Sequence, residues 1–151
     1  MPKAAPRSLK ARAIVWLSQR EHSRSELANK LKRVAVEDER VQIEPLLDWL
    51  IAHRYLDEQR FAESRVHARS AKFGNRRIQQ ELAQHGVTID AAASAQLKAS
   101  EFARAQLLWA RRFGAEPAAD AATRAKQMRF LAGRGFSADV IRRVVKGEDD
   151  A

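Results

Sequence analysis

The sequence predicts an all-α protein, specifically an elongated, curved tandem array of three-helix repeats built like helix-turn-helix modules. Three observations support this prediction. Alanine and leucine dominate the apolar residues, and the 151-residue chain has only six glycines and four prolines, which favours helix over sheet. Apolar residues recur every three or four positions, and no stretch alternates for long enough to predict a strand. The later part of the chain also contains an internal repeat.

Three helices are expected in the first third of the chain. The first begins after Ser8, where apolar residues start to recur on one face. Ser23 and Ser25 are candidate N-caps of the second helix. Residues 33–44 are predicted to form a loop. The third helix starts at Pro45, because proline is favoured in the first turn of a helix.

The middle of the chain predicts two helices separated by a glycine. Asp57 is the expected N-cap of a helix that ends at Gly74, where a left-handed residue is least costly. The next helix runs from an Asn75 cap to a stop at Gly86. A breaker followed by paired arginines therefore stands at the joint between two helices.

Four further helices are expected in the remaining sequence. One covers residues 87–98, and a separate helix runs from a Ser100 cap to Gly114. The last two cover residues 120–135 and 137–145, each with a start signal, a periodic interior and a stop.

Internal repetition organises these helices into modules. The stretch "RIQQELAQHGVTID", from Arg77, aligns without gaps with "KQMRFLAGRGFSAD", from Lys126. The alignment pairs Leu82 with Leu131, Gly86 with Gly135 and Asp90 with Asp139. A three-helix unit of this size buries too little apolar surface to be stable alone, so neighbouring units are expected to share core. The expected organisation is a flexible arm (1–7), three repeats (8–56, 57–98 and 99–147) and a disordered acidic tail (148–151).

Composition points to a polyanionic partner. The 28 Lys and Arg residues exceed the 19 Asp and Glu residues, for a net charge of +9, which favours contact with nucleic acid or an acidic protein surface. There is no cysteine, which excludes disulfides and thiolate metal sites. The longest apolar run near the N-terminus is residues 13–17, too short for a signal peptide or membrane span. We therefore expect a cytoplasmic monomer without membrane contact.

Residue patterns for catalysis or for cofactor binding are lacking in the sequence. Glu81 and His85 lie four apart on one predicted helix, but no second pair completes a metal site, so an exposed polar surface is favoured. No glycine-rich phosphate loop or nucleophile elbow is present. Trp16, Trp49 and Trp109 stand within apolar runs and are expected in the core. The sequence thus predicts a protein that is not an enzyme and has no cofactor or metal.

Basic residues supply the candidate binding site. No acid occurs between Glu63 and Glu81, and Arg65, Arg69 and Lys72 are spaced so that they share one side of a helix. Their stems are expected to cover the core margin while their charged ends reach solvent. Arg76 and Arg77 enter the first turn of the next helix, whose dipole favours an incoming anion. The third repeat carries a second basic set: Arg124, Lys126, Arg129, Arg134, Arg142 and Arg143.

The stretch "YLDEQRFAESRVHARSAKFGNRRIQQELAQHGV" resembles the signature of the RecX family, regulators of the RecA recombinase. That signature runs G-[YF]-L-[DN]-[DE]-x-[RE]-[FY]-A, followed by a basic helix and G-x-[RK]-x-I-x-x-E-L-x-x-[KR]-G. The matching residues are Tyr55, Leu56, Asp57, Glu58, Arg60, Phe61 and Ala62, then Gly74, Arg76, Ile78, Glu81, Leu82 and Gly86. The family's last motif is similar through Arg129, Phe130, Leu131, Arg134, Gly135, Phe136 and Ile141. The chain departs from the signature at His53 and Arg54, where a small residue is usual, and at His85, where a basic residue is usual.

The resemblance implies a tandem array of three-helix modules that binds in the helical groove of the RecA–DNA filament. It also implies inhibition of filament extension, ATP hydrolysis and strand exchange in recombination, DNA repair and the SOS response. Charge and position make the basic residues above candidate contacts for RecA or for DNA phosphates. Two alternatives remain open: a stand-alone, basic DNA-binding protein with helix-turn-helix-like units, and a helical scaffold for an unrelated protein.

Overall fold

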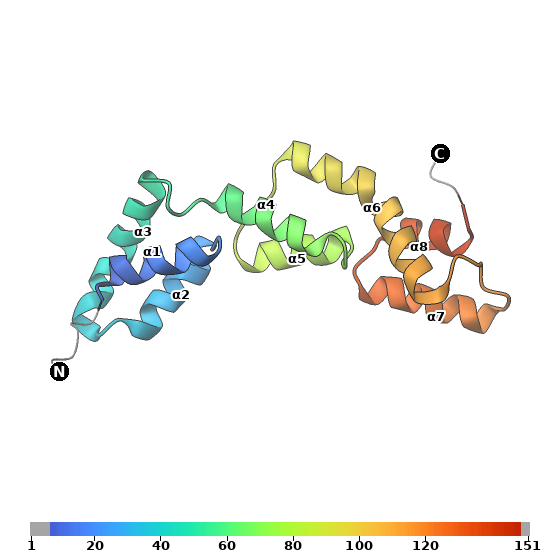
Figure 1. The fold of residues 1–151 in the computed structure, drawn as a ribbon, viewed down its shortest axis with the longest axis horizontal. Coiled ribbons are helices and arrows are strands. Elements are labelled where there is room, and N and C mark those ends of the chain that lie inside the picture. Colours follow the sequence, from blue (N-terminus) through green and yellow to red (C-terminus); the bar gives the residue numbers. More distant parts are fainter. Residues whose placement is uncertain (1–6, 149–151) are drawn as a thin grey trace. The chain divides into compact units, whose positions relative to one another are not determined.

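The computed structural model of the chain describes residues 7–148 and contains, within that range, only helices. This confirms the all-α prediction (Figure 1). The helices are α1 (Leu9–Gln19), α2 (Arg24–Val34), the 3-10 helix η1 (Glu37–Gln42), α3 (Ile43–Ala52), α4 (Glu58–Arg69), α5 (Asn75–Gln84), α6 (Ala91–Phe113), α7 (Ala121–Gly133) and α8 (Ala138–Val145). The expected N-terminal arm and acidic tail lie almost wholly outside the described residues.

The helices form two compact units. The N-terminal unit comprises residues up to Ser64 together with His85–Val87, and the C-terminal unit comprises Arg65–Gln84 together with residues from Thr88 onward. The boundary therefore falls inside α4. The predicted repeat boundaries (8–56, 57–98 and 99–147) stay predictions.

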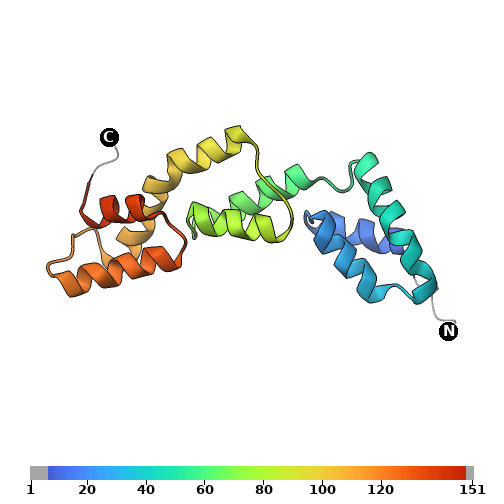
Figure 2. The same cartoon turned by 180° about the vertical axis from the view of Figure 1, so that it is seen from behind.

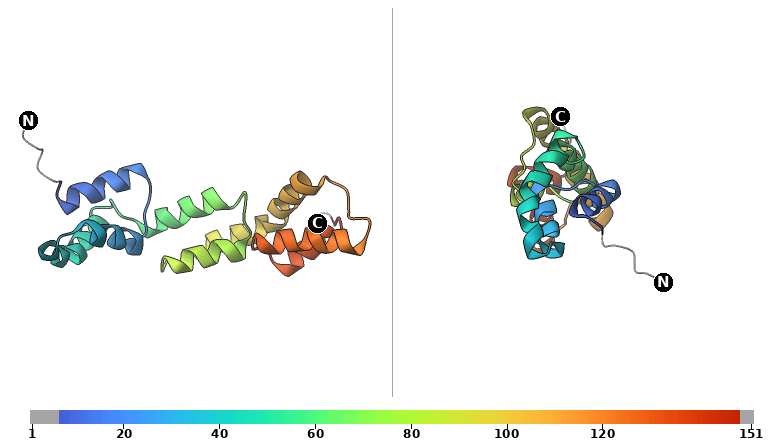
Figure 3. Two further views of the ribbon diagram at one scale, coloured as in Figure 1. Left: turned by 90° about the horizontal axis from the view of Figure 1, so that it is seen from below. Right: turned by 90° about the vertical axis from the view of Figure 1, so that its left-hand side faces the viewer.

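In the N-terminal unit, α1, α2 and α3 pack around one apolar core (Figure 3). Ser8 and Ser23 cap α1 and α2 by accepting backbone N–H bonds of 3.1 Å each, as the sequence predicts for Ser23. Burying a leucine side chain contributes about 2 kcal/mol, and this core is rich in leucine. Its buried members are Leu9, Ala13, Leu27, Ala28, Leu31, Ile43, Leu47, Leu50 and Leu56.

The predicted loop before the third helix is wrong over most of its length. Instead, η1 leads directly into α3, which begins at Ile43, two residues before Pro45. Reciprocal hydrogen bonds start η1: the Val36 N–H donates to the Glu39 side chain (3.1 Å), and the Glu39 N–H donates to the Val36 carbonyl (2.9 Å). Pro45 is tolerated in the first turn of α3 because N–H groups there need no helical partner.

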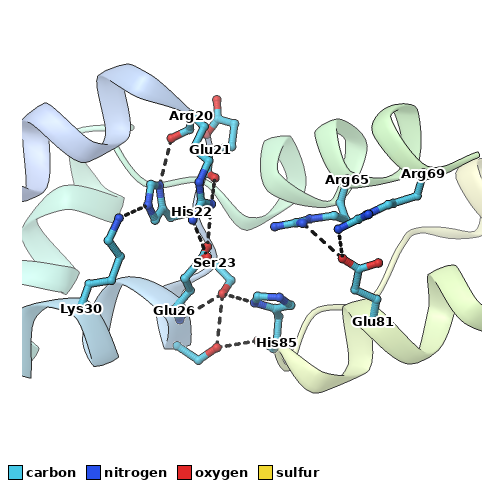
Figure 4. Close-up of polar contacts among 11 residues, drawn as sticks. Arg20, Glu21, His22, Ser23, Glu26, Lys30, Arg65, Arg69, Glu81 and His85 are labelled. Atoms are coloured by element: carbon cyan, nitrogen blue, oxygen red, sulfur yellow. Dashed lines mark hydrogen bonds and ion pairs between the residues drawn. The ribbon is translucent and has the colours of Figure 1, made fainter.

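A buried histidine lies at the turn between α1 and α2. Only 1% of His22 is exposed; its Nδ1 lies 3.0 Å from the Arg20 carbonyl oxygen and its Nε2 lies 3.0 Å from the Lys30 ammonium nitrogen (Figure 4). Because a protonated lysine has only donors, Nε2 must accept. His22 is therefore neutral, with its proton on Nδ1 donated to the Arg20 carbonyl.

Acidification is expected to destabilise the N-terminal unit through His22. Burial lowers the pKa of His22 below its ordinary value of 6.5; the positive charges of Arg20 and Lys30 add to this, while the Arg20 carbonyl and Glu26 oppose it. The unfolded chain then binds more protons than the folded one just below pH 6.5, so this contribution to stability is complete above that pH and is lost as the pH falls. One such proton changes the unfolding free energy by at most about 1.4 kcal/mol per pH unit.

Urea unfolding from pH 8 to pH 5, followed by tryptophan fluorescence in a Trp109→Phe background, measures this effect in the N-terminal unit. His22→Gln should flatten the loss of stability below pH 6.5. An equal pH slope in the His22 variant would contradict the assignment.

The turn after α5 belongs to the N-terminal unit through His85. The Nδ1 atom of His85 lies 2.8 Å from the Ser23 hydroxyl oxygen, and its carbonyl accepts a 3.1 Å bond from the Ser25 hydroxyl. Its ring contacts that of Phe61, with centroids 4.8 Å apart. His85, which replaces the usual basic residue of the family signature, thus serves a packing role.

In the C-terminal unit, α6, α7 and α8 contact one another around a second core (Figure 2). Its buried members are Phe102, Ala105, Trp109, Leu131, Phe136, Val140, Ile141, Val144 and Val145. The core prediction is confirmed for Trp109, whose indole N–H donates a 2.9 Å bond to the buried Gln127 side chain. Trp16 and Trp49 are only half-buried, at the margin of the N-terminal core.

The predicted break between two helices near Ser100 is wrong, because α6 continues through it. Ser100 does not cap a helix: its hydroxyl donates to the Leu97 carbonyl (3.2 Å) and accepts from the Arg104 Nε (2.9 Å). A serine within a helix satisfies its hydroxyl in this way without ending the helix, and the alanines around it favour helix. The N-cap of α6 is instead Asp90, which accepts from the Ala93 N–H at 2.7 Å.

In the internal repeat, the aligned glycines have the same backbone conformation, but the aligned aspartates hold different positions relative to the helix start. Gly86 and Gly135 both follow a helix with left-handed backbone, with φ of 70° and 88°. Asp90 caps α6, but Asp139 lies in the first turn of α8, where Ser137 is the cap. The same sequence pattern therefore starts the next helix at slightly different positions.

A candidate polyanion-binding surface

Phe73, in the turn between α4 and α5, is surrounded by arginines. The guanidinium carbon of Arg77 lies 4.0 Å from the ring centroid, that of Arg134 lies 5.6 Å away and that of Arg69 lies 5.8 Å away. These distances fall within the range of cation–π attraction. Residues from α4, α5 and the turn after α7 thus converge on one half-buried ring.

The arrangement continues onto a second aromatic ring. Arg134 also lies 5.3 Å from the centroid of Phe130, and Arg112, at the end of α6, lies 5.6 Å from it. Phe113 packs edge-on against Phe130, with centroids 5.3 Å apart. We call these residues the arginine–phenylalanine cluster: Arg69, Phe73, Arg77, Arg112, Phe113, Phe130 and Arg134.

Close backbone contact between two turns of the C-terminal unit builds this cluster. The Gly74 N–H donates a 2.8 Å bond to the Arg134 carbonyl, and the Arg76 N–H donates a 3.1 Å bond to the Gly135 carbonyl. A Cβ on Gly74 would lie 2.4 Å from the Gly135 carbonyl oxygen. The predicted left-handed role of Gly74 is therefore wrong, since its backbone is not left-handed. Glycine is needed at position 74 because the backbone of Gly135 and Phe136 lies too close to leave room for a side chain.

The start of α5, where we expected an incoming anion, is already contacted by an anionic side chain of the protein. One carboxylate oxygen of Glu101 accepts a 2.8 Å bond from the Asn75 N–H. The other accepts from the Ser137 hydroxyl at 2.8 Å and from the Ser137 N–H at 3.4 Å. Glu101 is only 5% exposed. It satisfies donors at the starts of α5 and α8 at once, as a carboxylate at a helix N-terminus can.

Arg104, one turn after Glu101, donates hydrogen bonds to backbone carbonyls that follow α4. Its Nη1 donates bonds of 2.9 Å to the carbonyls of both Ser70 and Phe73, and its Nη2 donates to the Asn75 side chain and to the Leu97 carbonyl. Asn75 is thus an acceptor for Arg104 and the first residue of α5. Burial lowers the pKa of Arg104, while the charge of Glu101 raises it. Neither charged residue was predicted to have this role.

Two of the predicted contact residues are ion-paired within the C-terminal unit. Arg65 and Arg69 both approach the same carboxylate oxygen of Glu81 at 3.2 Å (Figure 4). The Arg65 side chain is only 21% exposed, against 39% for Arg69. The charged ends, which were expected to reach solvent, do so only in part, because α5 brings Glu81 against them. These ion pairs also disfavour a metal site formed by Glu81 and His85, because the Glu81 carboxylate already has cationic partners.

The remaining predicted residues differ in their surroundings. Arg142 pairs with Asp139 at 2.5 Å, while Arg143 pairs with Glu148 at 3.4 Å and lies 4.4 Å from the Phe102 ring centroid. Arg142 is nevertheless exposed, and the other exposed residues outside the cluster are Lys72, Arg76, Arg124, Lys126 and Arg129. The structure therefore unites Arg69, Arg77 and Arg134, drawn from both predicted basic sets. Sequence reasoning missed Arg112, although the repeated Phe-Gly ending after it marks the position.

The cluster is suited to binding anions. A guanidinium packed on an aromatic ring keeps its N–H edge available for phosphate or carboxylate. Among residues 7–148, no group of three His, Asp or Glu side chains is placed to hold a metal ion. Nor does any helix in that range have the length and apolar character needed to cross a bilayer.

Comparisons with known proteins agree with this architecture. Residues 57–95 match the family model of the second three-helix domain of RecX, and residues 99–145 match that of the third. A protein from Herbaspirillum seropedicae named regulatory protein RecX is 54% identical over 94% of this chain and 91% of its own length. Its counterpart from Ralstonia nicotianae is 51% identical over 95% of this chain and 90% of its own length.

A solved structure shares the fold. The crystal structure of RecX from Lactobacillus salivarius superposes with a TM-score of 0.70 at 21% identity, covering 91% of this chain and 92% of that one. Together with the family models, this likeness confirms the predicted all-α array of three-helix modules.

Proposed function

Because this chain belongs to the RecX family of regulatory proteins, we propose that it regulates a RecA recombinase by binding the RecA–DNA filament. It lies in the helical groove of the filament and inhibits filament extension, ATP hydrolysis and strand exchange during recombination, DNA repair and the SOS response. The match of both later modules to RecX domains carries the proposal. The cytoplasm, where the recombinase acts on DNA, is the expected compartment.

The basic residues of the C-terminal unit supply the proposed contact surface. The arginine–phenylalanine cluster presents guanidinium groups whose positions are restrained by aromatic rings, which reduces the entropy lost on binding. Acidic groove surface or DNA phosphates are the partners that fit this charge. Exposed residues near the cluster in sequence, such as Lys72 and Arg76, extend the surface. The other proposed contacts are Arg65, Arg124, Lys126, Arg129, Arg142 and Arg143.

Binding inhibits only if it favours one filament state. The protein must contact more than one RecA subunit in the groove, so that its affinity is higher for the filament state that it blocks than for the extending state. Substoichiometric inhibition follows, since one bound molecule stops addition of many subunits. Long-range attraction speeds the encounter and weakens with added salt.

Charge reversal at Arg76 and Arg77 tests the surface. The double variant Arg76→Glu/Arg77→Glu should weaken inhibition of RecA ATPase on single-stranded DNA by about tenfold or more, since charge-assisted contacts contribute about 1.5 kcal/mol each. Folding should be retained, because both side chains are exposed. Circular dichroism and ATPase titration measure the two effects.

The matched control is Lys32→Glu/Arg33→Glu, which reverses two exposed charges in the last turn of α2. If both double variants lost the same inhibitory potency, the loss would come from the change in net charge alone, and Arg76 and Arg77 would not be part of the contact surface. The absence of any effect on RecA, combined with sequence-selective binding to naked duplex, would replace the proposal with a stand-alone DNA-binding protein.

A further inference from the structure

Three aromatic side chains stack at the end of α3, in the N-terminal unit. The ring centroids of Trp49 and His53 lie 4.0 Å apart with 21° between their planes, and those of Trp49 and Tyr55 lie 5.6 Å apart with 14° between their planes. Trp49 is half-buried against the core, His53 is exposed and Tyr55 is 44% exposed. Nearly parallel aromatic rings that are open to solvent offer a flat surface on which another ring can stack.

Backbone and side-chain bonds hold these rings in place. The N–H groups of Tyr55 and Leu56 both donate to the Leu50 carbonyl, at 2.9 and 3.1 Å, and Leu56 is buried in the core. The His53 Nδ1 atom lies 2.9 Å from the Trp49 carbonyl oxygen. The stacked surface is therefore fixed before any ligand arrives, which lowers the entropic cost of binding.

An arginine stands beside these rings at a position that favours glycine. Arg54 has φ of 61° and is the one non-glycine residue with positive φ among residues 7–148. A side chain in this conformation strains the backbone, so glycine is the least costly residue there. The conformation is maintained by a 3.0 Å bond from the Arg54 N–H to the Ile51 carbonyl and a 2.8 Å bond from Arg60 to the Arg54 carbonyl.

A second cation lies against the same stack. The ammonium nitrogen of Lys10 is 3.6 Å from the Trp49 ring centroid, and both Lys10 and Arg54 are exposed. Cations interleaved with open aromatic rings are the combination that binds a nucleic-acid strand: rings stack the bases, and cations attract the phosphates. We call this set the aromatic ledge: Lys10, Trp49, His53, Arg54 and Tyr55.

The geometry points to the aromatic ledge as a binding site for an unpaired base of a single-stranded nucleic acid. The base stacks on the exposed ring of Tyr55, and Arg54 contacts an adjacent phosphate. A duplex does not fit this chemistry, because its base faces are already covered by neighbouring base pairs. The inference goes beyond the proposed function, since it requires no recombinase and is tested without one.

Fluorescence anisotropy with the full chain tests base stacking directly. Labelled oligothymidylate is compared with an abasic oligonucleotide of equal length, which has the same phosphates and no bases. Tyr55→Ala should weaken oligothymidylate binding by about 5- to 150-fold, the range for loss of one base–aromatic stack, and should leave abasic binding unchanged. Tyr55→Phe, which keeps the ring, should bind as the parent does. Oligouridylate in place of oligothymidylate shows whether RNA is bound equally.

The variant Arg54→Gly separates binding from folding. Because glycine relieves the left-handed strain, this variant should unfold at a higher temperature than the parent and yet bind both oligonucleotides more weakly. The inference is overturned if Tyr55→Ala weakens both probes equally, or if Tyr55→Phe binds as weakly as Tyr55→Ala. It is also overturned if duplex competes as well as single strand, or if the parent prefers an acidic polypeptide to oligothymidylate.

Discussion

Replacing Gly135 with alanine is expected to destabilise the C-terminal unit by about 2 to 5 kcal/mol. Two costs combine. An alanine in left-handed backbone costs about 1–2 kcal/mol, and Gly135 has φ of 88°. Its Cβ would also lie 2.4 Å from the Cβ of Arg77 and 2.8 Å from the Arg77 N, and relieving such overpacking costs about 1–3 kcal/mol. The loss is a large fraction of the about 5–15 kcal/mol that stabilises a typical domain.

Other glycines of the chain provide graded controls. Gly86→Ala should show the backbone strain alone, since its φ is 70° and a Cβ there would have open space. Gly133→Ala should cause no loss, because this glycine lies within α7 with nothing near its Cβ position, and alanine favours helix by about 1 kcal/mol. Gly74→Ala should resemble Gly135→Ala, since its Cβ would meet the backbone of Gly135 and Phe136 at 2.4 Å.

Urea unfolding measures the Gly74, Gly133 and Gly135 variants in a Trp16→Phe/Trp49→Phe background, where Trp109 alone reports on the C-terminal unit. Gly86→Ala is measured in a Trp109→Phe background, because Gly86 lies in the N-terminal unit. If Gly135→Ala lost no more unfolding free energy than Gly86→Ala, the two turns would not touch. Since that contact also positions Arg77 and Arg134, Gly135→Ala should impair inhibition of RecA even at temperatures where the chain remains folded.

Removing the Glu101 side chain is expected to be almost as damaging, at about 3–5 kcal/mol for Glu101→Ala. The change leaves three donors of Asn75 and Ser137 without their acceptor. It also leaves the half-buried guanidinium of Arg104 without the nearby negative charge that stabilises it. Breaking a buried ionic arrangement by removing one partner costs this much because an uncompensated charge remains.

Glu101→Gln separates the contribution of the hydrogen bonds from that of the negative charge, because it keeps a carbonyl acceptor and removes the charge. It should lose about 1–2 kcal/mol. Glu116→Ala, at an exposed loop position of the same unit, should change stability by less than about 0.5 kcal/mol. If Glu101→Ala unfolded at the same urea concentration as Glu116→Ala, the carboxylate would not hold α5 and α8 together.

Helix positions were largely predictable because their signals are local. Ser23 and Asp57 accept bonds from backbone N–H groups within their own first turns, and Gly86 and Gly114 end helices in left-handed conformation. The errors arose where a local signal had a second interpretation. Ser100 looks like a cap in the sequence but bonds within α6, because its hydroxyl has partners one turn away on the same helix.

Binding residues were less predictable, because charge spacing does not show what packs against a charge. Arg65 and Arg69 share a helix face, as their spacing predicts, but Glu81 approaches them from α5. Arg77 and Arg134 belong to different predicted basic sets, and only the contact between two turns brings both to Phe73. The aromatic ledge similarly depends on ring orientations that no sequence pattern specifies.

Local sequence patterns were sufficient to predict the helical class, most helix ends, the internal repeat and the family to which the chain belongs. These depend on residues within one or two turns of each other, or on motifs that survive without knowledge of contacts. The packing of the helices shows which charges are neutralised, which glycine is required by close approach and which helix starts share the Glu101 carboxylate. Those outcomes depend on atoms that are distant along the chain and meet only when the helices pack.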